Sequence, residues 1–96
     1  MAAFIIADTK IEDADAYEDY KKQAKAIAET YGGNYRARGG ELDVIDTDLW
    51  SPTRVVIIEF PDMASARAFA RSPEYAEVAK IRHANAKSTL FIVDGG

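Results

Sequence analysis

The chain has 96 residues, of which 48% are hydrophobic and 29% charged, and its formal net charge at pH 7 is −4. This length and composition indicate a single folded domain over residues 1–96 and exclude an intrinsically disordered chain. The acidic charge disfavours nucleic acid and anionic membranes as partners, while the absence of cysteine excludes disulfides, thiolate catalysis and cysteine-ligated metals. No segment approaches the length of a membrane span, so we expect a soluble, cytoplasmic protein.

The first half of the chain predicts a strand, a helix and a hairpin. Residues 3–9 are short and apolar, as expected of a strand, and Asp13 predicts the N-cap of a helix that Gly32-Gly33 ends. Gly39-Gly40 predicts a two-residue turn between a strand over residues 34–38 and a return strand over residues 41–46. The apolar face of the helix follows from spacings of three and four residues between Tyr17, Tyr20, Ala24, Ile27 and Tyr31.

The second half of the chain predicts a strand, a broken helix and a final strand. Residues 54–60 are the strongest strand pattern, and Asp62 is expected to cap the helix that follows. Ser72-Pro73 restarts this helix, and residues 89–93 form the last strand. The resulting order predicts an α+β protein with a ferredoxin-like βαββαβ fold, in which two helices cover one face of an antiparallel sheet.

Two predicted strands are apolar on both faces. Val55 and Ile57 point to one side of the sheet and Val56 and Ile58 to the other, and residues 3–7 show the same lack of alternation. An antiparallel sheet with one wet face would alternate instead. Because the helices cover only one face, we expect a second copy to cover the other, which predicts a homodimer.

The residues described above resemble a known pattern. Gly32-Gly33, Arg38-Gly39-Gly40, the run over residues 54–61, the run over residues 72–75 and Arg82 resemble the uncharacterised family numbered thirteen-thirty among domains of unknown function. This resemblance covers almost all of the chain and implies the dimeric α/β-barrel superfamily. Relatives there include cofactor-free monooxygenases, haem enzymes, muconolactone-isomerase-like proteins and ligand-sensing modules.

The chain departs from the family pattern at one loop. The family tends to have Glu-Gly after the second hairpin arm, followed closely by Trp. Here Asp46-Thr47 stands in that place and Trp50 comes slightly later. We therefore expect this loop, and any site built on it, to differ in shape.

Two residues are candidates for catalysis. Glu59 shares a strand face with Val55 and Ile57, so it is either a base or ligand anchor in a buried cavity or, as we favour, a partner in a salt bridge. His83 is the only histidine, and it is either a general base or, given the haem enzymes among the relatives, an axial ligand, but it has no metal-binding spacing. A solvated position at a helix end is the favoured interpretation, and we expect no metal site.

Five residues are candidates for ligand binding: Arg38, Tyr17, Tyr20, Trp50 and Arg82. The arginines suit a carboxylate or phosphate ligand, although structural roles are favoured for both. The tyrosines either line a pocket or belong to a plain core, which their helical spacing favours. The tryptophan either covers a cavity or locks the dimer, and these two roles are evenly balanced.

Two classes of function remain open. The first is a homodimeric small-molecule-binding protein or cofactor-free enzyme, with its site between sheet and helices or between two sheets, and with no cofactor. The alternative is a non-catalytic structural or ligand-sensing dimer module, which predicts a filled interface. RNA binding comes last because residues 55–58 lack the aromatic side chains of a base-stacking strand.

Overall fold

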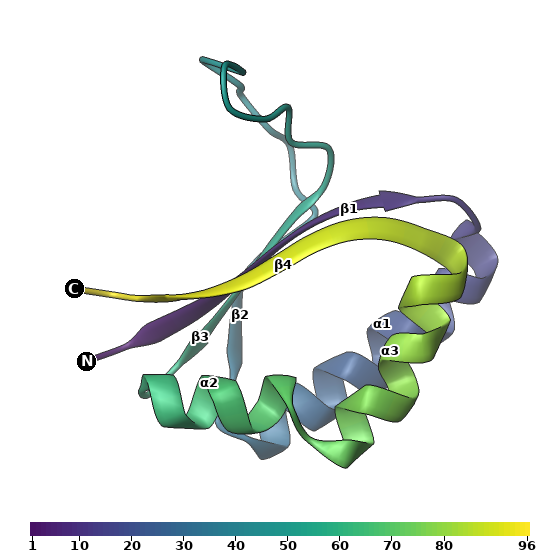
Figure 1. Ribbon diagram of the computed structural model, residues 1–96. Coiled ribbons are helices and arrows are strands. Elements are labelled where there is room, and N and C mark those ends of the chain that lie inside the picture. The colour runs from purple at the N-terminus through teal and green to yellow at the C-terminus, as the bar shows by residue number, and fades with distance from the viewer.

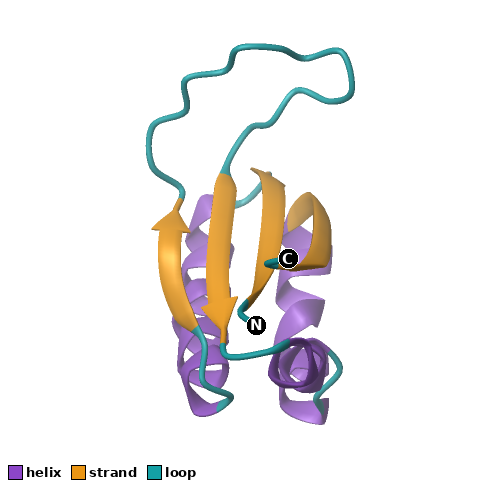
Figure 2. Cartoon of the chain, turned by 90° about the vertical axis from the view of Figure 1, so that its left-hand side faces the viewer, coloured by secondary structure: helices purple, strands orange, loops and turns teal.

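The computed structural model describes all 96 residues and has a ferredoxin-like architecture. Four strands form one antiparallel sheet in the order β2-β3-β1-β4, and the helices lie on one face of it (Figures 1 and 2). The expected fold is therefore confirmed. In chain order the elements are β1 (Ala3–Ile11), α1 (Ala14–Thr30), β2 (Asn34–Arg38), β3 (Val55–Phe60), α2 (Met63–Ala70), α3 (Pro73–Asn85) and β4 (Ala86–Asp94).

The three helices begin at the residues that the sequence predicts. Asp13 accepts a hydrogen bond from the backbone N–H of Ala16, and Asp62 does the same for the third residue of its own helix. Ser72 caps α3, with Pro73 in the first turn. Short polar side chains at these positions satisfy N–H groups that the helix itself leaves free. None of the three helices has the length and hydropathy required of a transmembrane segment.

Strands β1 and β4 are longer than predicted. β1 runs to Ile11 and β4 begins at Ala86, because the two strands pair along their full length from Ala3–Asp94 to Ile11–Ala86. The residues that extend β4 at its start are Ala86, Lys87 and Ser88, which have little intrinsic strand preference. Pairing with β1 decides their conformation, and that contact cannot be read from local composition.

The predicted return strand over residues 41–46 is wrong for the single chain. β2 and β3 pair directly, and the backbone N–H of Gly39 bonds to the carbonyl of Val55 at 2.9 Å. Residues 40–53, here called the arm, project away from the sheet without helix or strand (Figure 1). They pair with neither of the edge strands, β2 and β4. Gly39 has φ +73°, and a Cβ there would lie 2.6 Å from the Arg54 Nε atom. The position directly before the arm therefore requires glycine.

The sheet has an inner face against the helices and an uncovered outer face. Ile5, Ile58 and Phe60 are buried on the inner face and pack with Phe69 of α2. The outer face is bare in Figure 2. As predicted, it is also apolar, and its hydrophobic side chains are Phe4, Ile6, Val55, Ile57, Phe91 and Val93.

Candidate ligand-binding site

A pocket opens between the inner face of the sheet and helices α1 and α3. It contains about 510 Å³ of empty space, its mouth included, of which about 40 Å³ admits the centre of a water molecule. The space is therefore a narrow slot. We call it the inner pocket, and its apolar walls are formed by Ile5, Ala7, Val56, Ile58, Phe69 and Leu90.

Four tyrosines from three elements add polar groups to these walls. Tyr17 and Tyr20 come from α1, Tyr35 from β2 and Tyr75 from α3. The hydroxyls of Tyr20 and Tyr75 lie 2.6 Å apart in a buried hydrogen bond. Burial, reinforced by this neighbour, raises the pKa of Tyr20 far above its usual value, and burial raises the pKa of Tyr35 to about 12. Both hydroxyls therefore keep their protons at neutral pH.

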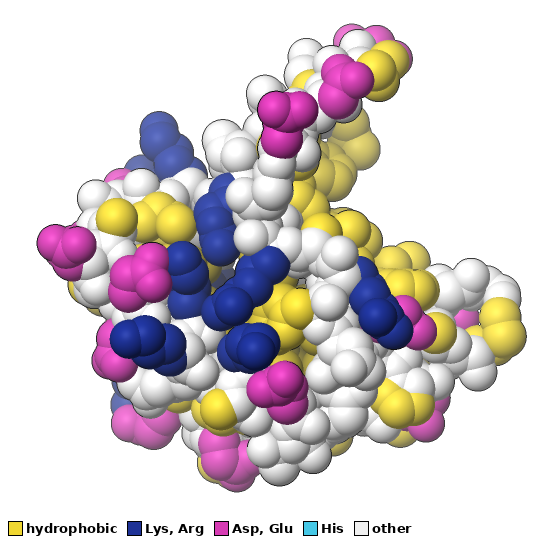
Figure 3. Space-filling view, turned by 180° about the vertical axis from the view of Figure 1, so that it is seen from behind, with side chains coloured by type: hydrophobic (Ala, Val, Ile, Leu, Met, Phe, Trp, Pro, Cys, Tyr) yellow, Lys and Arg dark blue, Asp and Glu magenta, His cyan; other side chains and the backbone are white.

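Four cationic side chains line the same pocket, and no Asp or Glu does. Lys21 pairs with Glu18 at 2.7 Å, but Arg38, Arg54 and Arg82 form no salt bridge. The Arg38 guanidinium carbon lies 5.2 Å from the ring centre of Tyr35, within the range of a cation–π contact. In Figure 3, Lys and Arg side chains gather around a hollow in which hydrophobic side chains are visible.

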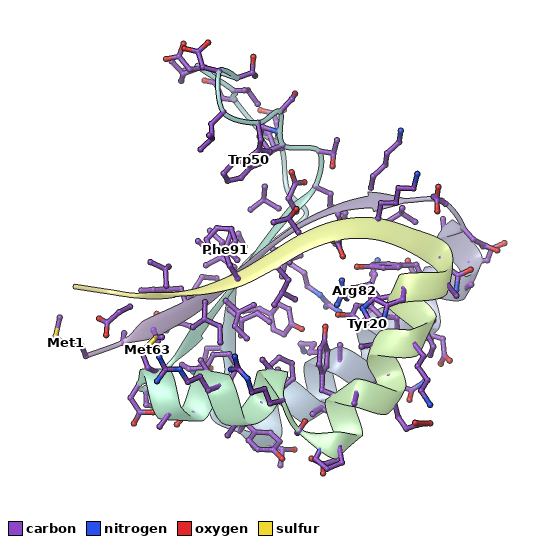
Figure 4. The ribbon with its side chains drawn as sticks, viewed as in Figure 1. Met1, Tyr20, Trp50, Met63, Arg82 and Phe91 are labelled. Carbon is purple, nitrogen blue, oxygen red and sulfur yellow. The ribbon has the colours of Figure 1, made fainter.

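Arg82 has the most constrained of these guanidinium groups. Its Nη1 atom donates to the Ser88 hydroxyl, and its Nη2 atom lies 3.2 Å from Nε2 of His83. Its Nε atom is buried without any hydrogen-bond partner, and no other side-chain nitrogen or oxygen in the protein is in that state. Figure 4 shows Arg82 and Tyr20 close together in the space between α3 and the sheet. This buried N–H is a donor without an acceptor.

The structure brings four of the seven predicted site residues into the inner pocket: Arg38, Tyr17, Tyr20 and Arg82. Glu59 lies on the outer face instead, where its Oε1 accepts a hydrogen bond from Nε of Arg36 at 2.9 Å. His83 is exposed at the end of α3, beside Arg82. Trp50 lies on the arm, with its ring centre 6.5 Å from that of Phe91 (Figure 4).

Several polar residues of the inner pocket were not among the predicted site residues: Lys21, Tyr35, Arg54 and Tyr75. Alternation along β3 is a signal for Arg54, because it places this residue on the same face as Val56 and Ile58. Alternation over residues 34–38 is likewise a signal for Tyr35, which pairs with Ile58. The register change between Tyr35 and Ala37 then places Arg38 opposite Val56, on the same face as Tyr35. A bulge of this kind redirects side chains and cannot be inferred from alternation.

Asp8 is a further polar centre that the sequence did not indicate, and it lies outside the inner pocket. Its carboxylate accepts hydrogen bonds from Nε1 of Trp50 at 2.8 Å, from the backbone N–H and the hydroxyl of Thr53, and from the backbone N–H of Arg54. Desolvation alone would raise the pKa of Asp8, but these hydrogen bonds together lower it below 3.8. Asp8 therefore holds the end of the arm against β1.

The inner pocket is suited to binding a molecule through hydrogen bonds. It holds guanidinium and hydroxyl donors on apolar walls. The chain has no group of three or more His, Cys, Asp or Glu side chains placed to hold a metal ion. The residues present can orient a molecule that accepts hydrogen bonds, and the Tyr20–Tyr75 pair can donate one of these hydrogen bonds to it.

Comparison with protein families gives one match. Residues 2–96 match the family model described as a domain of unknown function, DUF1330. No curated protein matches the chain.

Solved structures similar to the chain share its fold. RPA0582 from Rhodopseudomonas palustris, described as a protein of unknown function, is 23% identical with a TM-score of 0.76, covering 99% of this chain and 82% of that one. SnoaB from Streptomyces nogalater, a cofactor-independent oxygenase, is 11% identical with a TM-score of 0.68, covering 99% and 93%. A dimeric ferredoxin-like protein of unknown function from Jannaschia sp. CCS1 is 15% identical with a TM-score of 0.66, covering 98% and 99%.

Proposed function

This chain belongs to the family DUF1330, a domain of unknown function, and we propose that it is a homodimeric protein that binds a small organic molecule in the inner pocket. The observation that carries the proposal is the pocket itself. It lies between the sheet and the helices, and polar side chains from several elements converge on apolar walls. Concave, mostly apolar spaces with a few convergent polar groups are the usual form of small-molecule sites.

The uncovered face of the sheet supports the homodimer. Phe91 and Val93 are 38% and 41% exposed on this face, and both are large apolar residues. The Jannaschia protein of the same fold is described as dimeric. Sheet-to-sheet contact between two copies would remove this apolar surface from water.

A purely structural dimer module fits the pocket less well. A module of that kind has no need for a gap beneath its sheet, and filling the gap with larger side chains would stabilise it. Ala7 and Ala24 both line the inner pocket, where larger apolar residues would close it. These small side chains therefore support a role in which the inner pocket must stay open.

A cofactor-free enzyme is the second candidate, and the buried Tyr20–Tyr75 pair favours it. Of the two hydroxyl protons, one is used in the hydrogen bond between the residues, and the other is available to a bound molecule. Because the pKa of Tyr20 is raised, the pair keeps its protons, and it would stabilise negative charge that develops on a bound molecule by donating a hydrogen bond to it. Native mass spectrometry would identify a retained ligand. A change in the mass of that ligand on incubation with protein in air would support the enzyme, and an unchanged mass would support binding alone.

The binding proposal is tested by saturation-transfer NMR of a fragment library against the wild-type protein and Ala7→Phe. We expect fragments that bind the wild type to lose binding in Ala7→Phe, because the ring fills the inner pocket. Ala64→Phe is the matched control, since Ala64 is exposed on α2. Thermal unfolding would establish that both variants are folded. Equal fragment binding by Ala7→Phe and the wild type would contradict the proposal.

A further inference from the structure

The charge of the inner pocket is opposite to that of the molecule. The chain has a net charge of −4, yet four cationic and no acidic side chains line the pocket. Lys21 is neutralised by Glu18, while Arg38, Arg54 and Arg82 have no carboxylate partner. Arg54 and Arg82 are also partly buried, so water screens them less than it screens a surface arginine. Three unpaired guanidinium groups beside one apolar slot favour an anionic occupant.

The inner pocket also has hydrogen-bond donors that lack acceptors. The buried Nε of Arg82 donates to nothing, and the Tyr20–Tyr75 pair has one hydroxyl proton beyond the one it shares. Guanidinium groups offer donors only. A ligand that completes this site must therefore bring acceptor atoms, and a carboxylate matches the planar fork of a guanidinium better than other anions of similar size.

The walls define the rest of the ligand. Four tyrosine rings and aliphatic side chains surround a slot with little free depth. Apolar, flat walls suit an aromatic ring or another planar carbon skeleton, which packs against tyrosine faces and leaves no polar group unsatisfied. A bare inorganic anion would leave these walls without contact.

From these observations we propose that the ligand of the inner pocket is a small carboxylic acid in its anionic form, attached to a flat apolar body. Arg82 is the principal partner of its carboxylate, and Arg38 and Arg54 supply further positive charge. The inference rests on the proposed function and narrows it to one chemical class. It distinguishes the pocket from a site for neutral or cationic molecules of the same shape.

The test uses matched pairs of acids and amides, which have nearly the same shape but differ in charge. Benzoate and benzamide, 2-furoate and 2-furamide, and crotonate and crotonamide would each be titrated into the wild-type protein and followed by two-dimensional NMR. We expect each acid to bind at least about tenfold more tightly than its amide, corresponding to about 1.4 kcal/mol. The Arg82 Nε–H resonance should shift with the acids.

Two variants and a control assign the effect to the pocket. Arg82→Gln and Arg54→Gln should each weaken acid binding by about tenfold, as expected for loss of a charge-assisted hydrogen bond. Arg71→Gln is the matched control, because Arg71 is exposed, forms no salt bridge and lies outside the pocket, and it should bind like the wild type.

Four results would overturn the carboxylate proposal. If amides bind as tightly as acids, the pocket remains a small-molecule site, and only the charge assignment fails. The same holds if other fragments bind and no acid does. Equal affinity for inorganic phosphate would assign a general anion site instead. Loss of the dimer in Arg82→Gln or Arg54→Gln, without acid binding by the wild type, would assign the arginines to carboxylates of the second copy.

Discussion

At the scale of single residues, Asp8 fixes the end of the arm. Its carboxylate accepts four hydrogen bonds, and three of the donors belong to the arm itself, in Trp50 and Thr53. We expect Asp8→Ala to lower the free energy of unfolding by about 1–2 kcal/mol, a modest loss because the carboxylate is partly solvated. Urea denaturation would measure it. Asp8→Asn keeps one acceptor oxygen, so its unfolding free energy should fall by less than that of Asp8→Ala. A larger fall in Asp8→Asn than in Asp8→Ala would contradict this account.

The same carboxylate predicts a dependence of stability on pH. The pKa of Asp8 is lowered in the folded protein below its ordinary value of 3.8. Its charged form therefore stabilises the fold at pH values above 3.8, and this contribution is lost as the pH falls through the lowered pKa. The difference in unfolding free energy between wild type and Asp8→Asn should be constant near neutral pH and shrink in acid. A difference that grows in acid would contradict the assignment.

The buried hydroxyl pair predicts strong coupling between two tyrosines. Tyr20→Phe or Tyr75→Phe alone leaves one buried hydroxyl without its partner, so each should cost about 1–2 kcal/mol. The double variant removes both hydroxyls and should cost no more than one single variant, which a double-mutant cycle of thermal unfolding would show. Tyr31→Phe is the control, because Tyr31 bonds to Glu74 in an exposed position. Additive losses would contradict the coupling.

Residues of the candidate site were predictable where regular geometry applies. Tyr17 and Tyr20 follow from helical spacing, and alternation along β3 points to Arg54. Alternation over residues 34–38 also points to Tyr35, but it does not place Arg38 on the same face, which results from the bulge in β2. Asp8 was not predictable, since its partners lie more than forty positions away along the chain, as in the bond from Thr53.

At the scale of elements, the arm is the part of the fold where the prediction from the sequence, a return strand over residues 41–46, was wrong. The three helix starts were predicted because caps are local. Residues 41–44 alternate acidic and apolar side chains like a strand, yet no strand lies beside them. The edge strands β2 and β4 each have a free edge, but this stretch pairs with neither. We expect its partner in the second copy.

The arm therefore predicts a contribution to the dimer. Leu42 and Val44 are exposed at 38% and 43% and share one side of the alternating stretch. Replacing both by Ser should weaken the dimer by about tenfold, because apolar surface is then no longer removed from water. The double substitution of Glu41 and Asp43 by Ser, on the other side of the stretch, is the matched control. Sedimentation equilibrium measures both, and equal effects would contradict the prediction.

At the scale of the whole molecule, the outer face of the sheet is where we expect two copies to meet. Ile57 lies at the centre of this face and pairs with Ile6 of β1. Ile57→Glu places a charge where two sheets would meet, so we expect a folded monomer with unchanged helical circular dichroism. Ala64→Glu on α2 is the control and should remain a dimer. A wild-type monomer, or a dimeric Ile57→Glu protein, would contradict the sheet-to-sheet dimer.

The distribution of charge in the molecule has a consequence for colloidal behaviour. The arm contains Glu41, Asp43, Asp46 and Asp48 and no basic residue, so it accounts for the whole net charge of −4, and the remainder of the chain is neutral. In a single copy, the apolar side chains of the arm and of the outer sheet face are exposed to water. We expect the interspersed acids to limit the aggregation of single copies, because like charges repel one another. Replacing the four acids by their amides should leave the fold intact but remove this repulsion, and light scattering would then detect aggregates at neutral pH.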